Sequence, residues 1–348
     1  MNCGRSVAQS HKTLTLIAVI FLTMFLSIAT GLHAAETIKL KFATLYPKQD
    51  PNCLGVQYMF EELEKRTGGR VKITPYYSQS LGKAQEMLDM LNKGVADIAL
   101  FTPAVFPRVL VMTDVLSLPG LINKRAIATE VMYELGYRGL LDKDLAGYKV
   151  LLWAGTEPFG LGFVDKKVTK LEDLRKLKIR GPGGVTSGVL EALGPSVVTI
   201  PTSDIYMALD RGVTDGLVTG PGWYFTMKIN EVTKYWLWKP MGIGANLTIM
   251  TQEKWDKLPE DIKFIWTELM TETKYRFLED VEKWIPDTKA HFSKLGIEVY
   301  SLDSAEEARW DAIFNQYVAE WIADREAKGY PARETVEAVK QVVKRFTE

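Results

Sequence analysis

Histidine and cysteine are scarce in this sequence, which has three histidines and two cysteines among its 348 residues. Beyond residue 35 only His291 and Cys53 remain. A lone histidine argues against a Ser-His-Asp or Cys-His catalytic site and against a histidine-rich metal site. A lone cysteine cannot form a disulfide within its own chain. We therefore expect no catalytic residues, no metal and no cofactor.

An excess of charge of one sign is also lacking, because 43 Lys and Arg residues balance 43 Asp and Glu residues. A chain without a basic field is not expected to bind nucleic acid. The phosphate-binding pattern GxxxxGK[ST], the zinc pattern HExxH and the hydrolase pattern GxSxG are all missing. The carboxylates are scattered over predicted helix faces, so their spacing indicates no acid–base pair.

The first 35 residues differ in composition from the rest of the chain. They contain two basic and no acidic residues, and residues 14–32 are almost entirely apolar. Small residues, Ala34 and Ala35, end this segment. This order is typical of a secretory signal peptide. We predict that residues 1–35 are a signal peptide cleaved after Ala34 or Ala35, with a retained anchor helix as the alternative.

Strand and helix patterns alternate through the next part of the chain. Apolar and charged residues alternate at residues 38–43, as in a strand, and further strands are indicated at 71–76, 96–101 and 148–154. Helical periodicity separates them. This alternation predicts an α/β fold with a mainly parallel sheet, whose ligands bind at the carboxyl ends of the strands. The loops after those ends offer the candidate site residues Leu45, Lys83, Phe101 and Thr102.

Residues 171–194 combine several features of an anion-binding site. A predicted strand at 177–179 is followed by Arg180, by the run Gly-Pro-Gly-Gly at 181–184, and by a predicted helix from Thr186 or Ser187. The guanidinium is a planar donor to a carboxylate or sulfonate, and a helix N-terminus adds free N–H groups. An ordinary turn with a surface arginine has the same residues, so this stretch alone leaves both interpretations open.

Aromatic residues fall near the predicted strand ends and crossings. Each alone is more often a core residue, but several of them converging on one cleft would form an apolar pocket with few polar groups. Thr219 lies in the same kind of position, after a predicted strand at 214–218. The aromatic candidates are Phe101, Trp153, Phe159, Trp223 and Tyr224.

The second half of the chain is predicted to return to the first sheet. Residues 235–238 and 245–250 have strand patterns that we assign to the first domain, and 261–284 has the periodicity of a long amphipathic helix. Asp215, beside a glycine, is predicted to hold a loop through backbone hydrogen bonds.

Three segments together resemble the DctP-type periplasmic solute-binding proteins of TRAP transporters. They are KLEDLRKLKIRGPGG at 170–184, ALGPSVVTIPTSDIYMALDRGVTDG at 192–216, and LKFATLYP with SQSLGKAQEMLDMLNKGVADIAL near the start. The order of elements resembles that family from about Ile38 to the C-terminus.

The resemblance implies a two-lobe periplasmic binding protein fold, with an interdomain cleft, crossing strands and a long connecting helix. We expect lobe I to hold residues 36–158 and about 246–287, and lobe II to hold 159–245 and about 288–348. Arg180 stands at the family's carboxylate-binding arginine. The resemblance also implies a periplasmic location and delivery of an organic acid to the small and large TRAP membrane permease subunits.

Departures from the family pattern narrow the expected ligand. Gly160 stands near the position where many members have a second arginine, and the loops after the first and third strands offer Leu45 and Thr102 rather than strongly polar groups. We predict a monoanion, a carboxylate or sulfonate with an apolar or aromatic part, and no enzymatic activity. The alternatives are an exported enzyme acting on a small organic acid and a sensor module that presents its ligand. The predicted ligand-binding residues are Arg180, Trp153, Phe101, Thr102, Phe159, Thr219, Trp223, Leu45 and Lys83.

Overall fold

Two mixed β-sheets organise the part of the chain that the computed structural model describes, residues 37–284 and 288–347. The first sheet has the strand order β2-β1-β3-β10-β4. β1 pairs in parallel with β2 and β3, whereas β10 is antiparallel to both β3 and β4. Its strands are β1 (Ile38–Thr44), β2 (Val71–Tyr76), β3 (Ile98–Phe101), β4 (Tyr148–Pro158) and β10 (Ile243–Thr251).

The second sheet has the strand order β11-β9-β5-β8-β6-β7. β6 is parallel to β7 and β8, and β5 is antiparallel to β8 and β9. Its strands are β5 (Gly160–Phe163), β6 (Lys178–Gly181), β7 (Ser196–Thr199), β8 (Gly216–Thr219), β9 (Tyr235–Leu237) and β11 (Glu298–Tyr300). The prediction that 235–238 return to the first sheet is wrong, because β9 pairs with β5.

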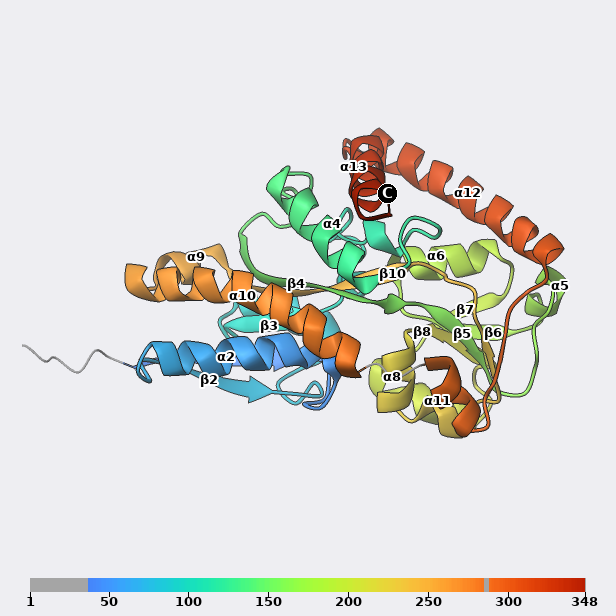
Figure 1. Cartoon of the computed structure of the whole chain (residues 1–348), viewed down its shortest axis with the longest axis horizontal. Helices are drawn as coiled ribbons and strands as arrows, with labels where there is room; N and C mark the ends of the chain where they lie inside the picture. The colour runs from blue at the N-terminus through green and yellow to red at the C-terminus, as the bar shows by residue number, and fades with distance from the viewer. Residues whose placement is uncertain (1–36, 285–287, 348) are drawn as a thin grey trace, which may run out of the picture.

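The chain crosses between the sheets in extended conformation. β4 ends at Pro158 in the first sheet and β5 begins at Gly160 in the second, so Phe159 lies at the crossing. β10 makes the return and closes the first sheet between β3 and β4. Figure 1 shows β4 running from the first sheet toward the second, with α10 (Glu260–Trp284) packed along α2 (Leu54–Arg66).

Helices cover the faces of both sheets. The predicted long amphipathic helix is α10, and its Trp266, Leu269 and Phe277 are buried as core residues. The remaining helices are α3 (Met87–Asn92), α4 (Arg125–Tyr137), α5 (Leu171–Leu174), α6 (Gly184–Ala192), α7 (Ile205–Asp210), α8 (Pro221–Thr226), α9 (Gln252–Asp256), α11 (Thr288–Lys294), α12 (Ser304–Ala327) and α13 (Ala332–Thr347). Within residues 37–284 and 288–347, no helix is long and apolar enough to cross a bilayer.

The last helix departs from the expected division into lobes. α12 lies against α6, but α13 turns back and packs on α4, which covers the first sheet (Figure 1). We therefore propose lobe boundaries near residues 158 and 246 with α13 assigned to lobe I rather than lobe II. The predicted signal peptide, residues 1–35, lies outside the described residues.

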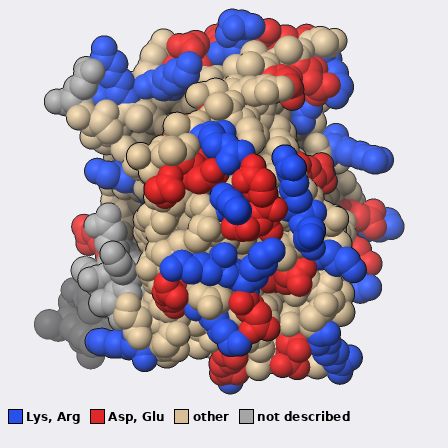
Figure 2. Space-filling view, turned by 90° about the vertical axis from the view of Figure 1, so that its right-hand side faces the viewer, with Lys and Arg blue, Asp and Glu red and all other residues tan. Residues whose placement is uncertain are grey.

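Charge on the surface is mixed in sign. Figure 2 shows basic and acidic side chains interspersed on the face at the right of Figure 1. Cross-element ion pairs form on the surface, such as Arg309 of α12 with Glu172 of α5, at 2.6 Å. This mixture agrees with the balanced composition of the chain.

Candidate functional site

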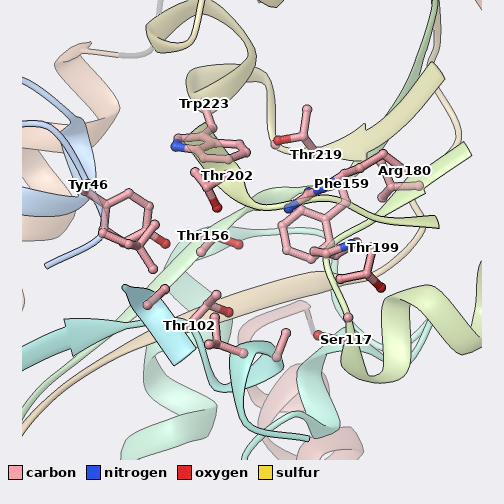
Figure 3. Close-up of a pocket in the computed structure, with 18 of the residues that line it drawn as sticks. Tyr46, Thr102, Ser117, Thr156, Phe159, Arg180, Thr199, Thr202, Thr219 and Trp223 are labelled. Carbon is pink, nitrogen blue, oxygen red and sulfur yellow. The ribbon is translucent and has the colours of Figure 1, made fainter. Parts of the chain in front are cut away.

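A cavity of about 290 Å³ lies between the two lobes. Residues that follow β1, β3 and β4 form one side of it, and residues that follow β6, β7 and β8 form the other. Parallel strands bring their carboxyl ends to one edge of a sheet, so each lobe presents these ends to the cavity. In Figure 3, Tyr46 and Thr102 face Arg180, Thr219 and Trp223 across it.

Arg180 is the one cationic side chain among the described residues that line the cavity. It lies in β6, beside Leu217 of β8 and Val198 of β7, and it is only 6% exposed. Within the described part of the chain the Arg180 side chain makes no hydrogen bond or ion pair, and its Nε is buried without a partner. Burial lowers the pKa of Arg180 to about 10, so it remains cationic at neutral pH.

Trp223 stands over this guanidinium. The Cζ atom of Arg180 lies 5.8 Å from the centre of the Trp223 ring. The ring comes from α8, which begins with Pro221 directly after β8. A guanidinium held against an aromatic face keeps its N–H groups in the plane free for a planar anion.

The glycine-rich turn after Arg180 differs from the prediction. α6 begins at Gly184, two residues before Thr186, because Gly183 and Gly184 adopt φ values of +103° and +56°. The Val185 N–H donates to Asp114 Oδ2 at 2.7 Å, and the Gly183 N–H donates to Ser187 Oγ at 2.8 Å. The N–H groups of Gly183 and Val185 are therefore already used within the protein. That other N–H groups at the start of α6 serve an anionic ligand stays a prediction.

Six of the predicted site residues line the cavity, and three do not. Phe101 is fully buried and packs edge-on against Phe106, with ring centres 5.1 Å apart. Trp153 is buried within the first sheet, opposite Leu247, and Lys83 is exposed just before the cavity residue Ala84. The six in the cavity wall are Leu45, Thr102, Phe159, Arg180, Thr219 and Trp223.

The sequence reasoning missed several residues of the cavity wall. β4 extends to Pro158 instead of ending at 154, so its carboxyl end presents Thr156 and Glu157 rather than Trp153. The missed polar residues also include Tyr46, Ser117, Thr199 and Thr202. The rule that strand ends line the site could have found Tyr46, Thr199 and Thr202. Ser117 lies instead at the end of the short 3-10 helix η4 (Val115–Ser117), whose position no local pattern indicates.

Glu157 carries a negative charge at the wall of the cavity, and it is paired. Its Oε1 lies 2.8 Å from Nη2 of the buried Arg125 on α4, and its Oε2 accepts a hydrogen bond from the Gly222 N–H at 3.2 Å. Arg125 balances this charge, so the unpaired charge at the cavity is that of Arg180.

Gly160 leaves no space for a second arginine. A Cβ atom at this position would lie 2.5 Å from Trp236 Cζ2, closer than real side chains approach. Asp215 has the structural role that was predicted, because its Oδ2 accepts a hydrogen bond from the Lys178 N–H at 2.7 Å at the start of β6. Among the described residues, no group of His, Cys, Asp and Glu side chains could hold a metal ion.

Comparison with known proteins identifies relatives across most of the chain. The model of the DctP family, described as bacterial extracellular solute-binding protein, family 7, matches residues 42–324. The C4-dicarboxylate-binding periplasmic protein DctP of Rhodobacter capsulatus is 28% identical over 322 residues, which cover 90% of this chain and 94% of that protein.

Solved structures have the same fold. A marine metagenome TRAP solute binding protein specific for aromatic acid ligands, in complex with metahydroxyphenylacetate, matches with a TM-score of 0.82 and 22% identity, over 89% of this chain and 100% of that one. A TRAP solute binding protein from Rhodoferax ferrireducens T118, in complex with copurified benzoate, matches with a TM-score of 0.79 and 20% identity, over 89% and 98%. At these identities the likeness extends to the fold, two lobes with a cleft between them.

Proposed function

The chain belongs to the DctP family of bacterial extracellular solute-binding proteins, family 7, and on this premise we propose that it captures a small organic monoanion with an apolar part. It is a TRAP solute-binding protein for small organic acids, and its family and the matched structures are binding proteins rather than enzymes. The alternative of an exported enzyme is therefore dropped.

One observation carries the proposed ligand charge. Arg180 is a buried cation without a partner among the described residues, at the wall of a cavity whose other charge, Glu157, is paired with Arg125. An unpaired buried charge is costly, and a ligand anion that forms a bidentate pair with the guanidinium offsets that cost. One free cation calls for one anionic group, a carboxylate or sulfonate.

The shape of the wall supports an apolar or aromatic body for the ligand. Phe159 and Trp223 supply apolar surface near Arg180 (Figure 3), and Leu45 adds apolar surface to the cavity wall. The threonines of the wall supply hydroxyls, which are neutral. Names of similar proteins include both aromatic acids and C4-dicarboxylates, and the single free cation favours the former kind of ligand here.

A binding screen tests this proposal. Protein freed of carried-over ligand by unfolding and refolding would be titrated in a calorimeter with benzoate, benzenesulfonate, malonate, succinate and glucuronate. We expect a monoanion to bind best. Binding by the dicarboxylates or the sugar acid alone would overturn the proposed ligand class.

The role of Arg180 has its own test. Arg180→Met should lose about 2–5 kcal/mol of binding free energy for the best monoanion, because the ligand's charge is then buried without its partner. Without ligand the variant should melt at the same temperature or higher, since an unpaired buried charge has been removed. Affinity within a factor of two of the wild type would contradict the assignment.

We also propose where the protein works and with what. A signal peptide at residues 1–35 would export it to the periplasm, where it would deliver its ligand to the small and large permease subunits of a TRAP transporter. Ligand uptake by vesicles containing both subunits, with and without this protein, tests the partnership. Uptake that does not depend on the protein would favour the ligand-presenting sensor module instead.

A further inference from the structure

Asp114 joins the two lobes at a point close to Arg180. It lies in the segment that follows β3 of the first sheet, just before the short 3-10 helix η4 (Val115–Ser117). Its carboxylate is buried and accepts two hydrogen bonds: the Val185 N–H donates to Oδ2 at 2.7 Å, and Ser117 Oγ donates to Oδ1 at 2.6 Å. Val185 belongs to the first turn of α6, which follows β6 of the second sheet.

The turn between Arg180 and α6 is pressed against this segment. A Cβ atom on Gly184 would lie 2.2 Å from Asp114 Oδ2, and one on Gly183 would lie 2.8 Å from the carbonyl oxygen of Ala104. Both glycines have positive φ, which other residues rarely adopt. The turn is therefore fixed on one side by the Asp114 carboxylate and on the other by Arg180's own strand.

No described residue holds the guanidinium of Arg180 by a hydrogen bond. Its side chain also makes no ion pair with any described residue, and it stands in a cation–π contact with the ring of Trp223. Its direction therefore depends on the backbone that carries it, β6 and the turn that follows. Asp114 itself does not line the cavity, so it does not meet the ligand.

We propose that Asp114 is a positioning residue for Arg180: its carboxylate anchors the turn at 181–184 to the first lobe and thereby aims the guanidinium into the cavity. This rests on the proposed function, in which Arg180 binds the ligand's anionic group. Binding groups must be held within a fraction of an ångström of the productive geometry, so loss of the anchor weakens binding without removing any ligand contact.

The charged and titratable neighbours of Asp114 are on α12. Arg325 interacts favourably with its charge. Burial, and after it the nearby Asp114 carboxylate, raises the pKa of the Tyr317 phenol. Burial raises the pKa of Asp114 to about 6. A transition of the turn between pH 5 and 7 that is lost in Asp114→Asn therefore reports the Asp114 carboxyl.

The first test needs no ligand. In protein labelled with ¹⁵N-arginine, the Nε–H resonance of Arg180 would be assigned by its loss in Arg180→Met. We expect Asp114→Ala to shift or broaden this resonance. Asp114→Asn should leave it near the position that the wild type shows below pH 5, because an amide, like the protonated carboxyl, can accept from Val185 and donate to Ser117. The wild-type resonance should titrate between pH 5 and 7, and that titration should be absent in Asp114→Asn.

A matched control separates positioning from a general loss of stability. Asp303 caps α12 in a similar way, with Oδ1 accepting from the Glu306 N–H at 2.9 Å, but it is exposed and does not line the cavity. Asp303→Ala should leave the Arg180 resonance unchanged. If Asp114→Ala does not fold, Asp114→Ser carries the same test. An Arg180 resonance identical in wild type and Asp114→Ala, or Asp114→Ser in its place, would overturn the proposal.

The second test measures affinity for benzoate by calorimetry. Asp114→Ala should weaken binding about tenfold, while Asp114→Asn and Asp303→Ala stay within about twofold of the wild type. Unchanged affinity in Asp114→Ala would also overturn the proposal. If the wild type binds no monoanion although its Arg180 resonance depends on Asp114, the proposed ligand class is wrong and the positioning role stands.

Discussion

Arg180 differs from the other buried charged residues near the cavity because its side chain has no hydrogen-bond or ion-pair partner among residues 37–284 and 288–347. Arg125 is paired with Glu157, and Asp114 accepts two hydrogen bonds. A folded chain seldom leaves a buried charge uncompensated, because the desolvation cost then falls on stability. In the function proposed above, this exception is why the ligand is expected to bring one negative charge to the cavity.

Gly160 lies close to Trp236 and leaves no space for a second cationic side chain beside Arg180. Substitution of Gly160 tests this packing. Gly160→Ala should destabilise the protein by about 1–3 kcal/mol, because the added Cβ would lie 2.5 Å from the buried Trp236. Urea unfolding measures the loss. Gly136→Ala is the control, since its Cβ would meet nothing closer than 3.9 Å in α4, and alanine favours a helix. A smaller loss at position 160 than at 136 would contradict the packing argument.

At the scale of elements, Glu157 connects three parts of the fold. It lies near the end of β4, pairs with Arg125 at the start of α4, and accepts the Gly222 N–H of α8, the helix that carries Trp223. The glycine of α8 permits this contact, because a Cβ on Gly222 would lie 2.6 Å from Glu157 Oε1. The ion pair therefore holds an element of lobe I and an element of lobe II on the same carboxylate.

Removing the Glu157 carboxylate alone should lower the free energy of unfolding more than removing Glu157 and Arg125 together. Glu157→Ala leaves Arg125 buried without its partner and should lower the free energy of unfolding by about 3–5 kcal/mol. The double variant Arg125→Ala, Glu157→Ala should lose less than the sum of the single variants, because neither charge is then stranded. Urea unfolding of the three variants measures the coupling, and additive losses would argue against a coupled pair.

The sequence predicts elements better than it predicts where they end. The alternation at 38–43 and the long amphipathic pattern at 261–284 correspond to β1 and α10, because both periods reflect one buried face. β4, in contrast, continues four residues past its predicted end, and this shift moves the cavity from Trp153 to Thr156 and Glu157. Strand ends depend on the partner strand, here β10, which comes much later in the chain.

The part of the candidate site that could be predicted is the part marked by local sequence, which is Arg180. In the sequence Arg180 comes directly after a predicted strand at 177–179 and before a glycine-rich turn, and both features are local. The structure places it within β6. The pairing of Arg125 with Glu157 and the contact of Asp114 with Val185 join segments far apart in sequence. No spacing rule finds such contacts, because they follow from how the two lobes are placed. The resemblance to a family supplied the cleft, but not the groups that support its arginine.

At the scale of the whole molecule, buried carboxyls should make stability depend on pH. Burial raises the pKa of Asp50 and of Asp114 to about 6 each. An unfolded chain has these pKa values near 3.9, so the folded state binds the protons more tightly. The stabilisation from these two groups is therefore fully present below about pH 4 and lost as the pH rises through 6.

We therefore expect the free energy of unfolding to fall by a few kcal/mol between pH 4.5 and pH 7. Urea unfolding across this range measures the slope, which should be shallower in Asp50→Asn and in Asp114→Asn. Ion-paired surface carboxyls such as Glu172, whose pKa Arg309 lowers to about 2, act below this window. Stability that rises between pH 4.5 and pH 7 would contradict the prediction.

The close packing of Gly160 against Trp236 also limits how this receptor could evolve. One base change converts a glycine codon into an arginine codon, so a single mutation could place a second cation for dicarboxylates at position 160. The Trp236 ring, buried against Tyr224 and Phe292, blocks that change until it is itself replaced by something smaller. Replacement of Trp236 would have to come first and would leave the core poorly packed. The order of these two substitutions is therefore set by the packing of the core rather than by the binding site.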